Sequence, residues 1–187
     1  MTTEISRLKD HVIVCGFGRI GQILAHDLQK QSIPFVVIDS NADRVNEASE
    51  STYLVLNGNA TEESQLEDAG IRQAKSLVTS LPSDADNVFI TLTARGMNQE
   101  VQIIARAEHR SSEKKLLQAG ANRVVLPATI GATQIAQIIT RPTTADFFNL
   151  ISDRTKLNLE CDEVIIPDGG ALVGKTVAEA EAHRTHG

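Results

Sequence analysis

Short hydrophobic runs alternate with amphipathic segments along the first two thirds of the chain. The runs are rich in β-branched residues, which favour strands. We predict six strands in them, over residues 11–15, 34–39, 53–57, 76–80, 101–105 and 123–126. The segments between the runs repeat apolar positions at helical spacing. We predict helices there over residues 19–31, 42–49, 62–69, 85–97 and 113–119. This alternation predicts an α/β fold with a doubly wound, six-stranded parallel sheet over residues 10–127.

Composition and glycine placement agree with that fold. Hydrophobic residues make up 41% of the 187 residues but aromatic residues only 3%, so the core must be aliphatic. An aliphatic core is typical of a parallel sheet that is buried on both faces. Gly70, Gly96 and Gly120 each follow a predicted helix, where we expect them to form left-handed C-caps.

The pattern changes after the sixth predicted strand. Residues 128–140 read "ATIGATQIAQIIT", which suits a helix but contains no charged residue. A helix without a charged face is usually covered on more than one side. We predict that a second helix follows over residues 143–152, with Phe147 and Phe148 on its apolar face, and then a strand over residues 157–166. We expect residues 154–187 to begin an incomplete C-terminal lobe.

Charge and cysteine content exclude several classes of protein. The net charge is −6 and no basic run is present, which argues against nucleic-acid binding. No apolar run approaches the roughly 18 residues of a membrane span, and the N-terminus lacks a signal-peptide core, so we expect a soluble chain. Cys15 and Cys161 match no metal or redox spacing, and we expect both to be buried, reduced thiols. Asp84 and Asp86 lie in "PSDAD", which we expect to cap the following helix rather than bind a metal.

A glycine motif joins the first predicted strand to the first long helix. The six residues of this G-x-G-x-x-G segment are all expected to contact a nucleotide, and they are Gly16, Phe17, Gly18, Arg19, Ile20 and Gly21. In this context Gly16 permits a tight turn, Gly18 lets a pyrophosphate approach the backbone, and Gly21 lets helix and sheet pack closely. The pyrophosphate would bind at the helix N-terminus. The alternative is a glycine turn that binds no ligand.

Acidic and polar residues follow the second and third predicted strands. Asp39 lies where an acidic residue meets ribose hydroxyls, and its carboxylate would repel a 2′-phosphate. NAD(H) or an adenine nucleotide (ATP, ADP or AMP) is therefore favoured over NADP, with Ser40 beside it. Asp39 could instead be a loop or N-cap residue, and Arg44 could flank the adenosine or be an ordinary surface charge.

Two further groups of candidates lie at strand ends. Asn59, Ala60 and Thr61 would lie beside the adenine or its ribose, although a simple Asn-Gly turn explains the same residues equally well. The candidates after the fourth and fifth strands are Ser80, Leu81, Arg106 and Glu108. The planar guanidinium of Arg106 suits a phosphate, and an ion pair with Glu108 is the alternative.

Hydride-transfer chemistry lacks its usual residues in this chain. A Tyr-x-x-x-Lys pair is impossible, since the only tyrosine is Tyr53 and Asn57 stands four residues on. Of the five histidines only His109 lies near the expected crevice, and no second catalytic group accompanies it. The roughly 60 residues after the sheet are too few for a substrate domain. We therefore predict a chain that is not an enzyme.

Five sequence stretches, taken together and in this order, resemble a known family more specifically than the glycine motif alone does. They are "HVIVCGFGRIGQ", "VVID", "NGNATEESQLEDAGI", "QIIARAE" and "LLQAGANRVVLPATIGATQIAQII". Over about residues 10–166 the chain resembles the RCK family (regulators of potassium conductance). These are Rossmann-like nucleotide-binding domains of potassium channels and Trk/Ktr-type transporters. The resemblance implies a cytoplasmic location at the inner face of the membrane.

The resemblance also implies an assembly and a function. The helices over residues 128–152 would form an intertwined homodimer, within a dimerisation segment spanning residues 128–153. By the same resemblance, such dimers would assemble into a larger ring that acts on a potassium pore. The implied function is a regulatory domain that couples NAD(H) or nucleotide binding to pore opening. Alternatives are the regulatory domain of a cation/proton antiporter, a small NAD-dependent oxidoreductase, and a structural ring element without a ligand.

One departure from calcium-gated family members bears on metal binding. Those members have carboxylates at three positions after the fourth and fifth strands. By motif, these positions hold Ser80, Arg106 and Glu108 in this chain. A single carboxylate is too few for Ca²⁺, which takes six to eight oxygen ligands. We therefore expect no metal at this place.

Overall fold

The computed structural model of the chain describes residues 2–140, with side chains from residue 4. Four predictions lie outside the described residues. They are the second helix over residues 143–152, the strand over residues 157–166, the C-terminal lobe over residues 154–187 and the burial of Cys161. Half of the dimerisation segment predicted for residues 128–153 also falls there.

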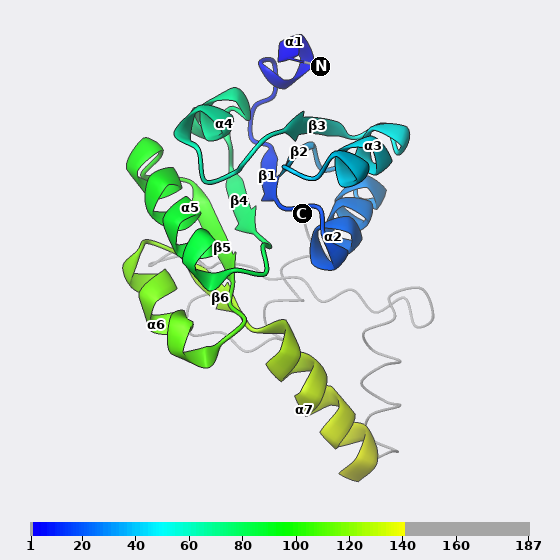
Figure 1. The fold of residues 1–187 in the computed structure, drawn as a ribbon, viewed down its shortest axis with the longest axis vertical. Helices are drawn as coiled ribbons and strands as arrows, with labels where there is room; N and C mark the ends of the chain where they lie inside the picture. The colour runs from blue at the N-terminus through cyan, green and yellow to red at the C-terminus, as the bar shows by residue number, and fades with distance from the viewer. Residues whose placement is uncertain (1, 141–187) are drawn as a thin grey trace, which may run out of the picture. The chain divides into compact units, whose positions relative to one another are not determined.

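All six predicted strands are present, and helices separate them (Figure 1). The strands are β1 (Val12–Cys15), β2 (Phe35–Asp39), β3 (Leu54–Asn57), β4 (Ser76–Thr79), β5 (Gln102–Arg106) and β6 (Arg123–Val125). The helices are α1 (Thr2–Ile5), α2 (Arg19–Lys30), α3 (Ala42–Glu50), α4 (Glu63–Asp68), α5 (Asp84–Met97), α6 (Arg110–Gln118) and α7 (Pro127–Thr140), with a 3₁₀ turn η1 (Ile71–Gln73). The prediction placed the start of α6 three residues too late, at residue 113.

The six strands form one parallel sheet in the order β3-β2-β1-β4-β5-β6. This order confirms the predicted doubly wound, Rossmann-like sheet. The chain direction across the sheet reverses between β1 and β4, where Val14 pairs with Val37 on one side and Val78 on the other. In such sheets the ligand crevice lies beyond the carboxyl ends of the strands at this switch point.

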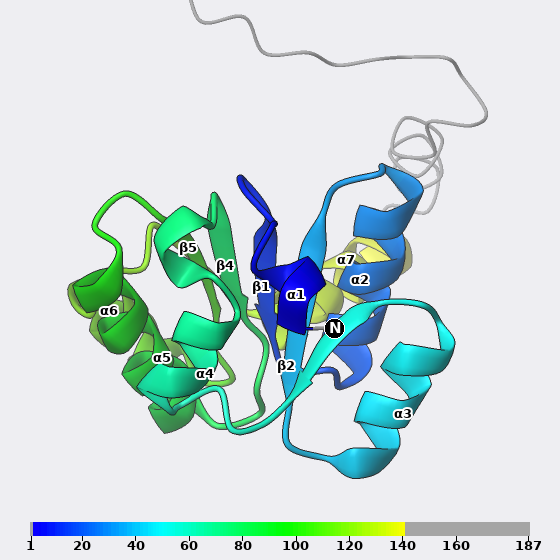
Figure 2. The ribbon, with the colours of Figure 1, turned by 90° about the horizontal axis from the view of Figure 1, so that it is seen from above.

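Helices cover the sheet on two sides (Figure 2). Helices α2 and α3 lie on one side, and α4, α5 and α6 on the other. Alternate residues of each strand point to opposite sides, so β2 is buried along its whole length. Val37 packs into the α2–α3 core, whereas Val36 and Ile38 pack into the opposite core. Burial of one such side chain stabilises the fold by about 1.5–3 kcal/mol. Two cores of this kind explain why the sequence is rich in aliphatic residues.

Two of the three predicted glycine C-caps are confirmed. Gly70 and Gly120 have φ of 78° and 108°, in the left-handed region. The prediction for Gly96 is wrong, because Gly96 lies inside α5 without a positive φ. The Asn98 side chain ends that helix instead. Its Nδ2 donates to the Ile71 carbonyl, and its Oδ1 accepts from two backbone N–H groups just beyond the helix.

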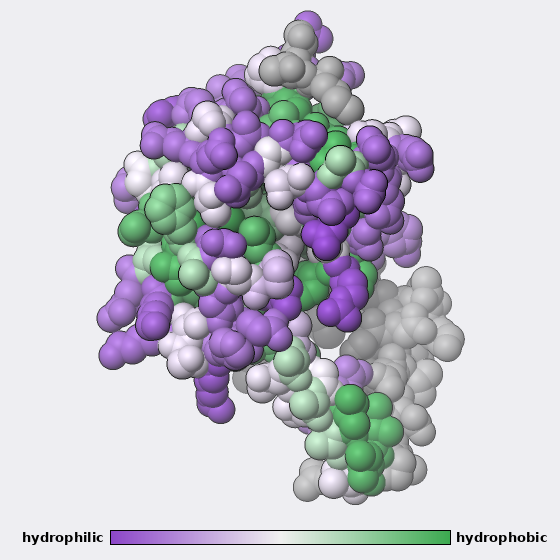
Figure 3. All heavy atoms as spheres, viewed as in Figure 1, coloured by the Kyte–Doolittle hydropathy of each residue, from purple (hydrophilic) through white to green (hydrophobic). Residues whose placement is uncertain are grey.

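Helix α7 stands apart from the other long helices in its burial. None of its residues is buried, and Ile135 and Ile139 are 61% and 75% exposed. Figure 3 shows hydrophobic side chains gathered on this helix, and others over α5, where Phe89 and Leu92 are exposed. The predicted cover of α7 is therefore not provided by its neighbours among residues 4–140.

Candidate functional site

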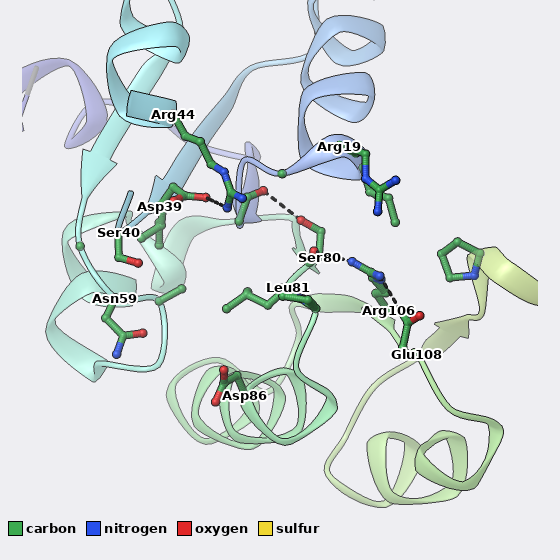
Figure 4. Close-up of a pocket in the computed structure, with 18 of the residues that line it drawn as sticks. Arg19, Asp39, Ser40, Arg44, Asn59, Ser80, Leu81, Asp86, Arg106 and Glu108 are labelled. Carbon is green, nitrogen blue, oxygen red and sulfur yellow. Dashed lines mark hydrogen bonds and ion pairs between the residues drawn. The ribbon is translucent and has the colours of Figure 1, made fainter. Parts of the chain in front are cut away.

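A cleft of about 680 Å³ opens beyond the carboxyl ends of the strands (Figure 4). This size lies within the range of small-molecule and cofactor sites. Of the sixteen residues predicted to bind a nucleotide, thirteen line it. They are Gly16, Gly18, Arg19, Ile20, Asp39, Ser40, Arg44, Asn59, Ala60, Ser80, Leu81, Arg106 and Glu108.

The three motif glycines have different surroundings. Gly16 has φ of 99°, a conformation that side chains disfavour. A Cβ on Gly21 would lie 2.0 Å from the Gly16 carbonyl oxygen, so this position has no room for a side chain. Gly18 lies open, since the heavy atom nearest to a Cβ added there would be Arg44 Nη1, at 4.0 Å. Gly16 and Gly21 therefore shape the turn, whereas Gly18 leaves space for a ligand.

The N-terminus of α2 faces this open space. Gly18 is the N-cap residue and has no side chain to satisfy the first-turn N–H groups. Unsatisfied N–H groups and the helix dipole together favour an anion. Arg19 begins the helix and also lines the cleft. This end of α2 can hold a phosphate or pyrophosphate.

Three predicted residues do not line the cleft. Phe17 is 2% exposed and packs edge-on against Tyr53, with ring centroids 6.1 Å apart. Gly21 lies behind the turn, in contact with Gly16. Thr61 donates its backbone N–H to Asn59 Oδ1 at 3.1 Å. These residues support the shape of the site, and sequence position alone did not distinguish them from lining residues.

Asp39 is buried at the carboxyl end of β2, with 6% of its surface exposed. Its Oδ2 accepts from the Phe17 N–H at 2.6 Å, and its Oδ1 from the Asn41 N–H at 2.8 Å. Arg44 Nη1 lies 3.6 Å from Oδ2. Asp39 is not an N-cap, because Asn41 caps α3 through its own side chain. The carboxylate is thus bound to the glycine turn and directed at the cleft.

Ser80 ties β4 to the same turn. Its hydroxyl lies 3.0 Å from the Cys15 carbonyl oxygen and 2.9 Å from the Gly16 carbonyl oxygen. Cys15, at the end of β1, is buried as predicted, and burial raises the pKa of its thiol to about 12. The thiol therefore stays neutral and unreactive at neutral pH.

Arg106 lines the cleft from the end of β5 and forms the predicted alternative ion pair. Its Nη2 lies 2.5 Å from Glu108 Oε2, and its Nη1 donates to the Ser80 carbonyl at 3.3 Å. Its Nε is buried and has no hydrogen-bond partner among the described residues. Figure 4 shows Arg106, Glu108 and Arg19 on one side of the cleft, and Asp39, Ser40, Arg44 and Asn59 on the other.

Asp84 positions the loop that carries Glu108. Its carboxylate accepts from the Glu108 N–H at 2.6 Å and from the His109 N–H at 3.0 Å. Desolvation acts to raise the pKa of Asp84, but these hydrogen bonds and one to Ser112 outweigh it and lower the pKa. The expected cap of α5 is supplied by Ser83.

The family model of the TrkA-N domain matches residues 12–127. The chain belongs to the TrkA-N domain family. This membership agrees with the RCK resemblance, since a similar solved structure is described as the RCK domain of the GsuK channel.

Among curated relatives, this TrkA-N protein is 38% identical over 187 residues to "Probable potassium channel protein 2" of Methanocaldococcus jannaschii. The alignment covers 96% of this chain and 54% of the relative. It is 31% identical over 133 residues to the "Putative cation/proton antiporter YbaL" of Escherichia coli, covering 71% of this chain and 24% of that protein. The chain spans about half the length of the channel protein it matches.

Solved structures confirm the fold. The TrkA-N domain of inner membrane protein ybaL from Escherichia coli superposes with a TM-score of 0.68 at 30% identity, over 71% of this chain and 98% of that one. The GsuK channel bound to NAD gives 0.63 at 28% identity, over 71% and 24% of the two chains. GsuK bound to ADP gives 0.63 at 27% identity, over 95% and 52%.

The structure adds six lining residues that sequence reasoning missed. They are Ile38, Gly58, Pro82, Asp86, Pro127 and Ala128. Ile38, Gly58 and Pro82 each adjoin a predicted position in the chain, so a wider window around each strand end would have found them. Asp86 was expected only to help cap α5, and the structure also places it in the cleft lining. Pro127 and Ala128 begin α7, and only the arrangement of the sheet brings them to the cleft.

The described part of this TrkA-N domain has neither a metal-binding cluster nor a membrane-spanning helix. No group of three or more His, Cys, Asp or Glu side chains among the described residues is arranged to hold a metal ion. No helix within residues 2–140 is both long and apolar enough to cross a membrane.

Proposed function

We propose that this TrkA-N domain binds NAD(H) or an adenine nucleotide and regulates a potassium channel or transporter, coupling occupancy of the cleft to pore opening. One observation carries the proposal. The buried Asp39 carboxylate is hydrogen-bonded to the glycine turn, which sets an acceptor for ribose hydroxyls beside a phosphate-binding helix end. The GsuK channel, which has the same fold, has been solved with NAD and with ADP.

In this proposal, different residues of the cleft bind different parts of the nucleotide. The pyrophosphate lies at the N-terminus of α2 against Gly18, and the ribose hydroxyls meet Asp39. Ser40, Asn59 and Ala60 lie beside the adenosine, with Arg44 flanking it. Arg106, paired with Glu108, faces the ligand from the other side of the cleft. Phe17, Gly21 and Thr61 act through the backbone shape that they maintain.

The domain acts as a binding module rather than an enzyme in this proposal. The cleft lining contains Asp, Glu and Arg side chains but, among the described residues, no His, Cys, Lys or Tyr. A hydride-transfer enzyme needs an acid or base beside the nicotinamide. Adding candidate alcohols or hydroxy acids with NAD should therefore give no absorbance change at the nicotinamide band.

Helix α7 supplies a route from the cleft to an assembly. Pro127 and Ala128 line the cleft, and the exposed Ile130, Ile135 and Ile139 follow on the same helix. We infer that residues 128–152 form a homodimer that covers these side chains, within a larger ring beside the pore. A ligand shifts such an assembly only if it binds one conformation better than another. Contact between the bound nucleotide and the start of α7 would provide that difference in affinity.

In the protein that carries it, this domain would then lie on the cytoplasmic side of the membrane, at its inner face. The Methanocaldococcus jannaschii relative supports a potassium channel, and YbaL supports a cation/proton antiporter as the second candidate. Proteoliposomes containing that protein would distinguish the two. Nucleotide-dependent K⁺ flux without proton movement supports the channel, and obligatory proton exchange supports the antiporter.

Calorimetry and thermal unfolding of the chain with NAD, NADH, NADP, ATP, ADP and AMP test the binding itself. At a hundredfold excess over Kd, the true ligand should stabilise the fold by about 2–3 kcal/mol. Gly18→Ala should fold normally, because the site of its methyl group is open, yet lose most of the affinity. Gly96→Ala is the matched control, since nothing lies within 4 Å of its added Cβ. Binding that survives Gly18→Ala, or absence of binding in the unmodified chain, would contradict the proposal.

A further inference from the structure

The ion pair at the Arg106 side of the cleft changes what that side can recognise. Arg106 and Glu108 both line the cleft, and their charges are 2.5 Å apart. Arg106 is the more buried partner, so its charge is screened mainly by Glu108 rather than by water. Before any ligand arrives, Arg106 therefore belongs to a neutral pair, and Arg19 is the other cation that lines this side of the cleft.

Glu108 already occupies a nitrogen of Arg106 that a phosphate would use. A guanidinium binds a phosphate through two parallel N–H groups, and both edges that can do so include an Nη nitrogen. Here Nη2 is bound to Glu108, and Nη1 to the Ser80 carbonyl. A terminal phosphate at this side must therefore displace Glu108 or bear repulsion from its carboxylate. An uncharged group has neither requirement.

Arg106 still has N–H groups for a ligand. A guanidinium carries five N–H donors, and the bonds to Glu108 and to the Ser80 carbonyl occupy two of them. A hydroxyl or carboxamide oxygen could accept from a remaining Nη N–H while Glu108 stays in place. The pair is therefore suited to an uncharged, oxygen-bearing group.

We propose that Glu108 is a specificity-determining residue that makes the cleft prefer NAD(H) to ATP. The inference rests on the proposed nucleotide function. With adenosine at Asp39 and phosphates at α2, the part of the ligand beyond the pyrophosphate reaches Arg106. In NAD(H) that part is a riboside with a carboxamide, whereas in ATP it is a further phosphate. Glu108 accepts the first and opposes the second.

The local structure allows the Glu108 charge to be removed cleanly. The loop is held by the Glu108 and His109 backbone N–H groups, which donate to Asp84. Glu108→Gln leaves these bonds intact and retains a side chain of the same size. Any change in ligand preference then reports the carboxylate charge and not the loop position.

Calorimetric titration of the whole chain with NAD, ATP and AMP, without Mg²⁺, tests the inference. In Glu108→Gln the affinity for ATP should rise at least about fivefold, as expected for a partly buried charge. The affinities for NAD and AMP should change less than about twofold, because neither places a phosphate at Arg106. Glu47→Gln is the matched control, since Glu47 bonds Gln22 outside the cleft lining and should leave all three affinities unchanged.

A double variant makes the result specific to the pair. In an Arg106→Ala background, Glu108→Gln should no longer favour ATP over NAD, because no cation remains to be released. Equal changes for NAD, AMP and ATP, or no change for ATP, would overturn the role of Glu108 while leaving nucleotide binding intact. If the unmodified chain bound none of the three, the proposed function itself would fail. The two failures are thus distinguishable.

Discussion

Each side of the cleft carries an ion pair, and the two pairs differ in which partner is the less exposed. At one side the acid is buried and the base exposed, with Asp39 at 6% and Arg44 at 48%. At the other side the base is the less exposed partner, with Arg106 at 19% and Glu108 at 42%. The buried Asp39 carboxylate has two backbone N–H donors, whereas the buried Arg106 Nε has no partner among the described residues.

Because of this difference, Asp39 is preorganised for its ligand, whereas Arg106 can exchange its partner. Backbone N–H groups hold Asp39 in place before a ligand arrives, so no reorganisation is needed when it binds ribose hydroxyls. The Arg106–Glu108 contact joins two side chains at the cleft surface, and such pairs are weak enough to be exchanged. Asp39 is therefore suited to recognising the adenosine that all adenine nucleotides share, and Arg106 to discriminating between the groups attached beyond it.

Gly21→Ala should have the largest effect, because it disrupts the turn that links the two sides. The new methyl group would lie 2.0 Å from the Gly16 carbonyl, in backbone that cannot move aside easily. We expect a loss of about 3 kcal/mol in the free energy of unfolding, measured by urea denaturation. Gly96→Ala, in the open interior of α5, should instead stabilise by up to about 1 kcal/mol. Equal effects at both glycines would refute the steric argument.

Asp39→Asn should have the next largest effect and should act on one side of the cleft only. The amide replaces an acceptor oxygen with a donor that faces either the Phe17 or the Asn41 N–H. We expect a destabilisation of about 2 kcal/mol and at least a roughly tenfold loss of NAD affinity. Calorimetry and urea denaturation measure the two effects. Asp27→Asn, at an exposed position on α2, serves as the control. If Asp39→Asn kept the NAD affinity of the unmodified chain, Asp39 would not be the residue that binds the ribose hydroxyls.

Asp84→Asn should weaken the side that carries Glu108, and its effect should depend on pH. The hydrogen bonds that lower the pKa of Asp84 stabilise the fold while the carboxylate is ionised. That stabilisation is complete above the usual value of 3.8 and is lost as pH falls through the lowered pKa. Urea denaturation should therefore show a difference of about 1 kcal/mol between variant and unmodified chain at pH 7. The difference should shrink at acidic pH, and a difference independent of pH would contradict this explanation.

Arg44→Ala should have the smallest effect. Its guanidinium is half exposed and 3.6 Å from Asp39, so the pair contributes no more than about 0.5 kcal/mol to stability. Thermal unfolding should show a nearly unchanged midpoint in the absence of nucleotide. A large loss of stability would mean that Asp39 depends on Arg44 and not on its backbone donors.

Most of the fold and much of the cleft could be predicted from sequence, because their signals are local. Strand and helix periods, the glycine turn at Gly16 and the acid that ends β2 are each visible within a few residues. Gly96 shows the limit of local signals. It resembles a C-cap, yet α5 continues past it until Asn98 hydrogen-bonds Ile71, which is 27 residues away. The late prediction for α6 has a similar origin, since Asp84, at the start of α5, holds the backbone just before α6.

The sequence by itself determined the Rossmann-like class of this protein, its aliphatic core and the positions of its strand ends. It also identified the polar residues at those ends, because side-chain alternation and glycine turns follow from each residue and its neighbours. Only the tertiary structure decided that Phe17 is buried beside an open Gly18, and that Arg106 pairs with Glu108 while bonding Ser80. It also brought the start of α7 to the cleft. These arrangements depend on the strand order, which places residues that are far apart in the chain at one edge of the sheet.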